Sequence, residues 1–129
     1  MIVADASTVV LALGDDGTGG DAARRRLSGE RIVAPELLDV EVVSAWRRHE
    51  TTGRMDARRA ELARRDLRDL PIERISHRSL MERCWELRAN VTTYDAVYVA
   101  LAEALDAPLV TADAKLAGAP GIGCSIELI

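Results

Sequence analysis

The chain has 129 residues, of which 48% are hydrophobic and 29% are charged, and its formal net charge is −4. This length and composition exclude a disordered chain and fit one hydrophobic core, so we expect residues 1–129 to form a single domain. The acidic balance gives no general attraction for nucleic acid, and the apolar run at residues 96–102 is too short to cross a bilayer.

Short apolar segments alternate with helical patterns along the chain. In chain order, we expect a strand at residues 2–4, a helix at 7–13, a loop at 14–20, a helix at 21–27, a strand at 31–34, a helix at 35–52, a helix at 56–69, a strand at 72–75, a helix at 77–87, a helix at 92–105, a strand at 109–111, a helix at 114–117 and a strand at 124–128. Pro35 suits the first turn of its helix, whereas Gly53 and Pro71 end the elements before them. The alternation predicts an α/β fold of three layers, in which helices cover both faces of a parallel sheet of about five strands.

The two cysteines, Cys84 and Cys124, are far apart and belong to no CxxC or Cys/His pattern. We therefore expect two buried thiols in a reducing compartment, and neither a disulfide nor a zinc site. The first residues also lack a basic stretch ahead of a long apolar run, which favours a soluble protein of the cytoplasm.

Four acidic residues lie where strand ends and helix starts would bring them together. Asp5 and Asp113 each follow an apolar strand, whereas Glu41 and Asp95 lie in otherwise apolar helical stretches. In a parallel sheet, sites form beyond the carboxyl ends of the strands. Carboxylates gathered there repel one another and resist burial unless a cation neutralises them. Because hard divalent ions prefer oxygen ligands, this pattern predicts an Mg²⁺ or Mn²⁺ site.

Each acid also has a purely structural interpretation. Asp5 and Asp113 could each cap the helix that follows, and Asp95 suits the first turn of its helix. Glu41 could face solvent, and Asp39 is an alternative acid on the same helix that periodicity leaves open. Asp95 is nevertheless the only charge between Arg88 and Glu103, in a helix that is apolar on nearly all sides, so we expect its carboxylate to be buried and to need a partner.

Four segments, in order, carry a resemblance to a known family. They are Ile-Val-Ala-Asp-Ala-Ser at residues 2–7, Pro-Glu-Leu-Leu-Asp-Val-Glu at 35–41, Thr-Tyr-Asp-Ala-Val-Tyr-Val-Ala-Leu-Ala at 93–102 and Leu-Val-Thr-Ala-Asp-Ala-Lys-Leu at 109–116. These segments resemble the motifs of PIN domains, and together they cover essentially the whole chain. The size of the chain resembles that of the VapC toxins of bacterial toxin–antitoxin pairs.

The resemblance implies a PIN-like endoribonuclease that depends on Mg²⁺ or Mn²⁺ and acts as a toxin. Carried over to this chain, the catalytic acids are Asp5, Glu41, Asp95 and Asp113, and the supporting hydroxyl groups are those of Ser7 and Thr111. The expected metal ligands among the acids are Asp5, Asp95 and Asp113. The resemblance also implies an RNA substrate, a homodimer and a VapB-like antitoxin that covers the site.

Arginine clusters offer contacts for RNA on this acidic protein. Arg24, Arg25 and Arg26 follow the first loop and are our candidates for binding the RNA backbone. The arginines of residues 58–68 instead suit a solvated helix face. Aromatic residues make up only 3% of the chain, so we expect no extended platform for base stacking.

Two alternative functions are weighed against the metal-dependent nuclease. His49 and His77 could support a metal-independent mechanism, but neither lies beside the acids in the sequence, and general acid–base catalysis needs two groups at one phosphate. A non-catalytic RNA- or protein-binding module on a PIN-like scaffold is the stronger alternative. Metal-dependent cleavage of RNA would separate this module from the enzyme.

Overall fold

The computed structural model describes residues 1–129 and is built around one five-stranded sheet. The strands are β1 (Ile2–Ala4), β2 (Ile32–Pro35), β3 (Ile72–Ile75), β4 (Leu109–Thr111) and β5 (Ile126–Leu128). Every neighbouring pair is parallel, and the spatial order is β3-β2-β1-β4-β5. The chain builds outward from β1 to β3 and then continues on the other side of β1, so the strand order switches between β1 and β4. The predicted parallel sheet is confirmed.

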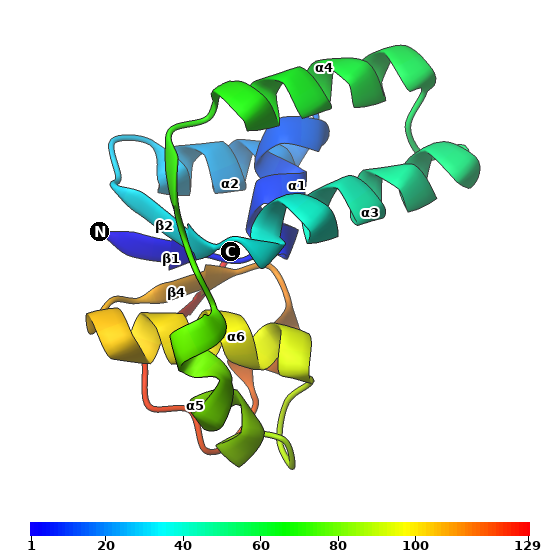
Figure 1. The fold of residues 1–129 in the computed structure, drawn as a ribbon. Helices are drawn as coiled ribbons and strands as arrows, with labels where there is room; N and C mark the ends of the chain where they lie inside the picture. The colour runs from blue at the N-terminus through cyan, green and yellow to red at the C-terminus, as the bar shows by residue number, and fades with distance from the viewer.

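Helices cover both faces of this sheet, which gives the predicted three layers (Figure 1). They are α1 (Ala6–Gly14), α2 (Thr18–Leu27), α3 (Leu37–Thr51), α4 (Ala57–Asp69), a short 3₁₀ helix η1 (Arg78–Leu80), α5 (Met81–Glu86), α6 (Thr93–Leu105) and α7 (Ala114–Ala117). In Figure 1, α1 to α4 lie above the strands, and α5 and α6 lie below them. The antiparallel pair of α3 and α4 extends beyond the carboxyl ends of the strands.

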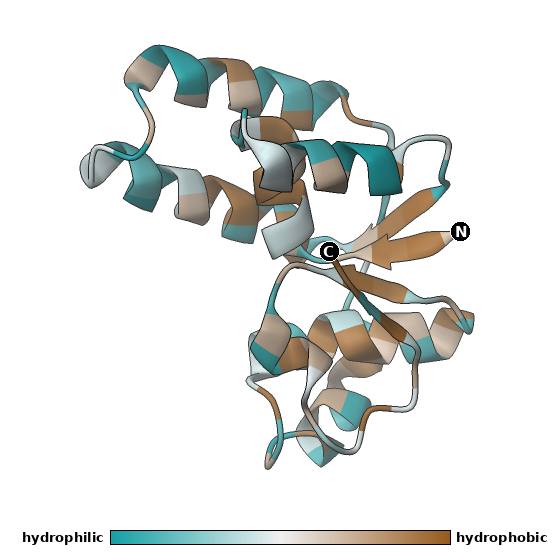
Figure 2. Cartoon of the chain, turned by 180° about the vertical axis from the view of Figure 1, so that it is seen from behind, coloured by the Kyte–Doolittle hydropathy of each residue, from teal (hydrophilic) through white to brown (hydrophobic).

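The core lies between the sheet and the two helix layers. Its 32 buried hydrophobic residues form one continuous cluster. The central strands are buried on both faces and are therefore hydrophobic along their length, as Figure 2 shows in brown. Helix α6 packs against β1, β2 and β4 and buries every residue of 96–102, which explains its nearly uniform apolar sequence. No helix in the chain has the length and apolar character needed to cross a membrane.

Close packing of α1 on α3 depends on Gly14. A Cβ atom at this position would lie 2.5 Å from Nε1 of Trp46, whose side chain is 1% exposed. Such a distance is far inside the contact limit, so a larger residue would push the helices apart. Gly14 therefore sets the separation of the two helices that begin beside the acidic residues.

The assignment of Pro35 to the first turn of a helix is wrong. Pro35 is the last residue of β2, and α3 begins at Leu37. The register between β2 and β1 ends at Val33, and Pro35 pairs only with Ile75 of β3. The missing N–H of proline therefore falls outside the central ladder, which is where a strand tolerates it.

Other boundaries differ less. Helix α2 begins at Thr18, inside the predicted loop at 14–20. The predicted helix at 77–87 is divided into η1 and α5. Both cysteines are free, as predicted. Cys84 is buried, but Cys124, which precedes β5, is only half-buried, so the prediction of two buried thiols is wrong for Cys124.

Candidate metal centre

Asp5 lies at the carboxyl end of β1 and is only 5% exposed. Its Oδ1 atom accepts hydrogen bonds from the Ser7 hydroxyl at 2.7 Å and from the backbone N–H of Thr8 at 3.0 Å, and the Thr8 hydroxyl is also 3.0 Å away. Its Oδ2 atom accepts from the Thr111 hydroxyl of β4 at 2.6 Å. Asp5 therefore caps α1, as its structural interpretation predicted, and also connects two strands where their order switches.

Asp113 lies just beyond the end of β4 and caps α7. Its Oδ1 atom accepts from the backbone N–H of Lys115 at 2.8 Å, while its own N–H donates to the Thr111 hydroxyl at 3.0 Å. The Ser7 hydroxyl accepts from the N–H of Ala112 at 2.9 Å. Ser7 and Thr111 thus connect the strand ends that carry the two aspartates. The capping bond uses Oδ1 of Asp113 and leaves Oδ2 available to a ligand.

Glu41 comes from the second turn of α3 and is held by a tyrosine of α6. The Tyr98 hydroxyl donates to Oε2 of Glu41 at 2.8 Å, and Tyr98 is 1% exposed. Burial raises the pKa of Glu41, the Tyr98 hydrogen bond opposes this shift, and the charges of Asp95 and Asp5 add to it. Glu41 is therefore half-buried, held by Tyr98, and under the influence of the charges of Asp95 and Asp5.

Asp95 lies in the first turn of α6, where Thr92 is the N-cap. The backbone N–H of Asp95 donates to the Thr92 hydroxyl at 3.1 Å. Burial raises the pKa of the Asp95 carboxyl, a hydrogen bond with Thr92 opposes this shift, and the charges of Asp113 and Asp5 raise the pKa further. The expectation of a buried carboxylate is met only in part, because Asp95 is half-buried, but the charges of both strand-end aspartates act on it.

None of these four carboxylates forms an ion pair; the ion pairs of the chain all use other acids. Asp39, the alternative acid on α3, instead makes a two-pronged contact with Arg74 at 2.8 and 3.0 Å. The charge of Asp39 is therefore compensated within the fold, whereas that of Glu41 is not. This difference separates the two acids where sequence periodicity could not.

The donor set fits a hard divalent cation by its chemistry. It consists of carboxylate oxygens whose mutual repulsion has no positive partner, and a cation would relieve that repulsion. As the side chains lie, no three His, Cys, Asp or Glu residues form a ready-made group that could hold a metal ion. Because Mg²⁺ usually keeps several waters, the acids need not all contact it.

The three arginines predicted to bind RNA differ in their surroundings. Arg24 donates to two backbone carbonyl groups and pairs with Asp21 at 2.6 Å. Arg26 pairs with Glu30, three residues after the end of α2, and with Glu127 of β5. Arg25 is exposed and forms no ion pair. Two of the three guanidinium groups are thus used within the fold, and an RNA contact by this cluster stays a prediction.

A groove of about 760 Å³ opens beside the acids and is lined mainly by α1 and α3. We call it the α1–α3 groove. Ser7 and Glu41 line its acidic end, whereas Arg48, His49 and Arg54 line the part at the C-terminal end of α3. The groove therefore joins the candidate metal centre to a basic surface.

The two histidines do not form an acid–base pair. His49 lies near the C-terminus of α3, and His77 precedes η1, where its Nδ1 atom is buried without a hydrogen-bond partner. Burial lowers the pKa of His49, and the charges of Arg54 and Arg48 lower it further. Nothing in this arrangement supports a metal-independent mechanism built on His49 and His77.

Two hydroxyl-bearing residues of the site are absent from the sequence-based prediction. Thr8 contacts Asp5, and its position three residues after a capping aspartate was an available signal. Tyr98 contacts Glu41, and its position one helical turn after Asp95 in a buried helix was another. A buried tyrosine hydroxyl needs a partner, and here the partner is a site carboxylate.

Comparison with known proteins agrees with this geometry. The family model of the PIN domain matches residues 2–121, and the chain belongs to the PIN domain family. The resemblance stated from the sequence is thus confirmed.

Within that family, the chain is similar to proteins named as VapC ribonucleases. It is 42% identical over 129 residues to Ribonuclease VapC9 of Mycobacterium tuberculosis (strain ATCC 25618 / H37Rv), covering 100% of this chain and 98% of that protein. It is 44% identical over 128 residues to Ribonuclease VapC1 of the same strain, covering 98% and 96%. The crystal structure of Mycobacterium tuberculosis VapC20, a Sarcin-Ricin loop cleaving toxin, matches with a TM-score of 0.69 at 16% identity, covering 95% of this chain and 96% of that chain. At that identity the likeness supports the fold.

Proposed function

We propose that this chain is a VapC-type endoribonuclease, dependent on Mg²⁺ or Mn²⁺, that acts as the toxin of a toxin–antitoxin pair. The observation that carries the proposal is a group of four carboxylates without ion pairs at the strand-order switch. Within this group, the charges of neighbouring acids raise the pKa values of Glu41 and Asp95. Similarity along the whole chain to proteins named as VapC ribonucleases supports the same assignment. The catalytic domain would comprise residues 1–129.

In this proposal, the residues around Asp5 orient the metal ligands. A bound divalent cation would supply a water of lowered pKa and would withdraw charge from the phosphodiester. Asp5, Asp95 and Asp113 would hold it, directly or through water. The hydroxyls of Ser7 and Thr111 keep the Asp5 carboxylate in one orientation. Oxygens held in this way need little rearrangement when the substrate arrives.

Glu41 is our candidate for accepting a proton from the attacking water. Tyr98 donates to Oε2 and leaves Oε1 for a second partner. The pKa of Glu41 is raised by burial, which brings this carboxylate closer to the pH at which a general base works best. The leaving 3′-oxygen would take its proton from solvent, giving a 3′-hydroxyl end.

Cleavage of RNA by matched variants tests the proposal. The purified chain is incubated with total cellular RNA in Mg²⁺ or in a chelator, beside Asp5→Asn and the control Asp39→Asn. We expect cleavage by the wild type and by Asp39→Asn in Mg²⁺, and none by Asp5→Asn or in chelator. Cleavage that survives the chelator would refute the metal dependence. RNA binding without cleavage at any Mg²⁺ or Mn²⁺ concentration would favour the non-catalytic module.

The proposal includes protein partners. A VapB-like antitoxin would cover the site, and the toxin would form a homodimer, both in the cytoplasm where the RNA lies. The exposed side chains of Val40 and Val43, 68% and 41% accessible on α3, are apolar surface that such a protein could bury. Co-purification with the cognate antitoxin and light scattering of the free toxin would test the two assemblies.

A further inference from the structure

The basic end of the α1–α3 groove is built by the last turn of α3 and the turn that follows it. Arg48 and His49 belong to α3, and Arg54 follows the helix. Gly53 has a φ of 77°, a conformation that favours glycine, and this turn lets the N–H of Arg54 donate to the carbonyl of His49 at 2.8 Å. The hydroxyl of Thr52 donates to the carbonyl of Arg48 at 2.8 Å. The backbone thus holds Arg54 beside His49.

The two arginines of this end have no acidic partner. Neither Arg48 nor Arg54 takes part in an ion pair, and the only side-chain hydrogen bond of Arg48 goes to the Ser44 hydroxyl, at 3.2 Å. Asp15 lines a small adjoining cavity together with His49 and Arg54, but its carboxylate accepts the N–H of Gly20 at 2.7 Å. The positive charge at the end of the groove is therefore uncompensated.

We infer that Arg48, His49 and Arg54 form a second binding subsite, which holds a backbone phosphate of the RNA away from the bond that is cleaved. The inference rests on the proposed ribonuclease function and adds to it the path of the substrate. Two guanidinium groups and an imidazole around one cavity supply the donors that a phosphate accepts.

The spacing suits a single strand of RNA. Glu41 and Arg48 are seven residues apart on α3, which is about 10 Å along the helix axis. In a fully stacked strand the phosphates are spaced by about 3.4 Å along the axis, and in a more extended strand they are farther apart, so the two ends of the groove are separated by at most about three nucleotides. One phosphate can therefore occupy the basic end while the scissile phosphate lies at the acids.

The charge distribution favours RNA over a protein as the occupant of the basic end. A phosphodiester is repelled by the acidic centre, and the chain as a whole carries a charge of −4. An enzyme of this charge needs attractive contacts at a distance from the reacting bond, and such remote binding energy can serve the reaction. The basic end supplies this attraction within the same groove that contains Glu41.

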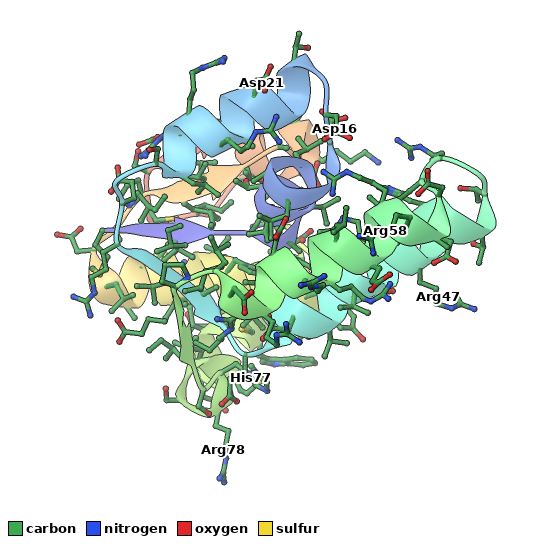
Figure 3. All side chains as sticks on the ribbon, turned by 90° about the horizontal axis from the view of Figure 1, so that it is seen from above. Asp16, Asp21, Arg47, Arg58, His77 and Arg78 are labelled. Atoms are coloured by element: carbon green, nitrogen blue, oxygen red, sulfur yellow. The ribbon has the colours of Figure 1, made fainter.

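The salt dependence of RNA binding tests the subsite without requiring cleavage. Binding of a 12-nucleotide single-stranded RNA is measured in chelator over a range of salt concentrations for the wild type, Arg48→Ala, Arg54→Ala and the double variant. The control is Arg47→Ala, an exposed arginine on the same helix whose side chain points away from α3 into solvent (Figure 3). Each lost phosphate contact should reduce the slope of log K against log salt by about 0.7.

We expect the double variant to bind the RNA more weakly and with a slope shallower by about 0.7 to 1.4, and Arg47→Ala to keep the wild-type slope. Equal slopes for the double variant and the control would overturn the subsite. Unchanged RNA binding with weakened binding of the cognate antitoxin would also overturn it and identify this end as a protein contact. A wild type that binds RNA through the subsite but never cleaves it would refute the proposed function alone.

Discussion

Removing the hydroxyl of Tyr98 isolates the contact that holds Glu41. In Tyr98→Phe the ring keeps its place in the core, and only the hydrogen bond to Oε2 of Glu41, 2.8 Å long, is lost. A hydrogen bond to a charged group contributes about 1.5–3 kcal/mol, and one to a neutral group about 1 kcal/mol. We therefore expect the variant to lose about 2 kcal/mol of unfolding free energy when Glu41 is ionised.

The loss should depend on pH in a defined direction. The Tyr98 hydrogen bond lowers the pKa of Glu41 against the effect of burial, so its removal raises the folded-state pKa further. The folded variant then binds more protons than the folded wild type between the two folded-state pKa values. By linkage, the stability difference between them widens as the pH rises through this window and narrows below it.

A double-mutant cycle measures the energy of this contact. It compares urea unfolding of the wild type, Tyr98→Phe, Glu41→Ala and the double variant, in chelator, at pH 8 and at mildly acidic pH. The coupling energy should be about 1.5–3 kcal/mol at pH 8 and smaller in acid. A coupling near zero at both pH values, or one that grows in acid, would refute the argument that Tyr98 holds a half-buried, ionised Glu41.

Three further predictions follow from the site and its packing. Burial and like charges raise the pKa of Asp95 in the folded state, so without metal the ionised carboxylate destabilises the fold above that pKa and does not do so below the pKa of the unfolded state. Asp95→Asn should therefore raise the melting temperature in chelator near neutral pH and not in acid. A lower melting temperature at neutral pH would contradict this electrostatic argument. Mg²⁺ at ten times its Kd should stabilise the wild type by about 1.4 kcal/mol at neutral pH, seen as an upward thermal shift of a few degrees that Asp5→Asn lacks; an equal shift in both proteins would point to binding elsewhere. Gly14→Ala should lower the free energy of unfolding, measured in urea, by about 1–3 kcal/mol, because its Cβ would meet Trp46. Gly118→Ala should lower it less, because its Cβ would have its closest neighbour at 3.5 Å. Equal losses in the two variants would contradict the packing argument.

The sequence was sufficient to predict the sheet because the pattern of short apolar strands leaves few alternatives. The strands around Val3, Val33 and Val110 are buried on both faces, and their hydrophobic runs stand out between charged helices. The position of Pro35 was missed because proline suits both a helix start and a strand end. Only the register of β2 with its two neighbours distinguishes these cases, and register is a tertiary property.

At the candidate site, the sequence could propose the acids but not the residues that contact them. Glu41 and Asp39 differ because Arg74, 35 residues beyond Asp39, pairs with one of them, and no local pattern contains that contact. The Tyr98–Glu41 bond likewise spans 57 residues. The interpretation of Asp5 as a cap is confirmed, because its Oδ1 caps α1. Its Oδ2 accepts the hydroxyl of Thr111, and a role of Asp5 as a metal ligand stays a prediction.

Direct Mn²⁺ binding tests the claim on which the mechanism depends, namely that carboxylates from distant segments share one divalent cation. The free-ion signal of Mn²⁺ in electron paramagnetic resonance reports its uptake by the wild type, Asp5→Asn, Asp113→Asn and the control Asp39→Asn. We predict saturable uptake by the wild type and by Asp39→Asn, and at least tenfold weaker uptake by each of the other two. Equal affinity in all four proteins would contradict a shared metal centre.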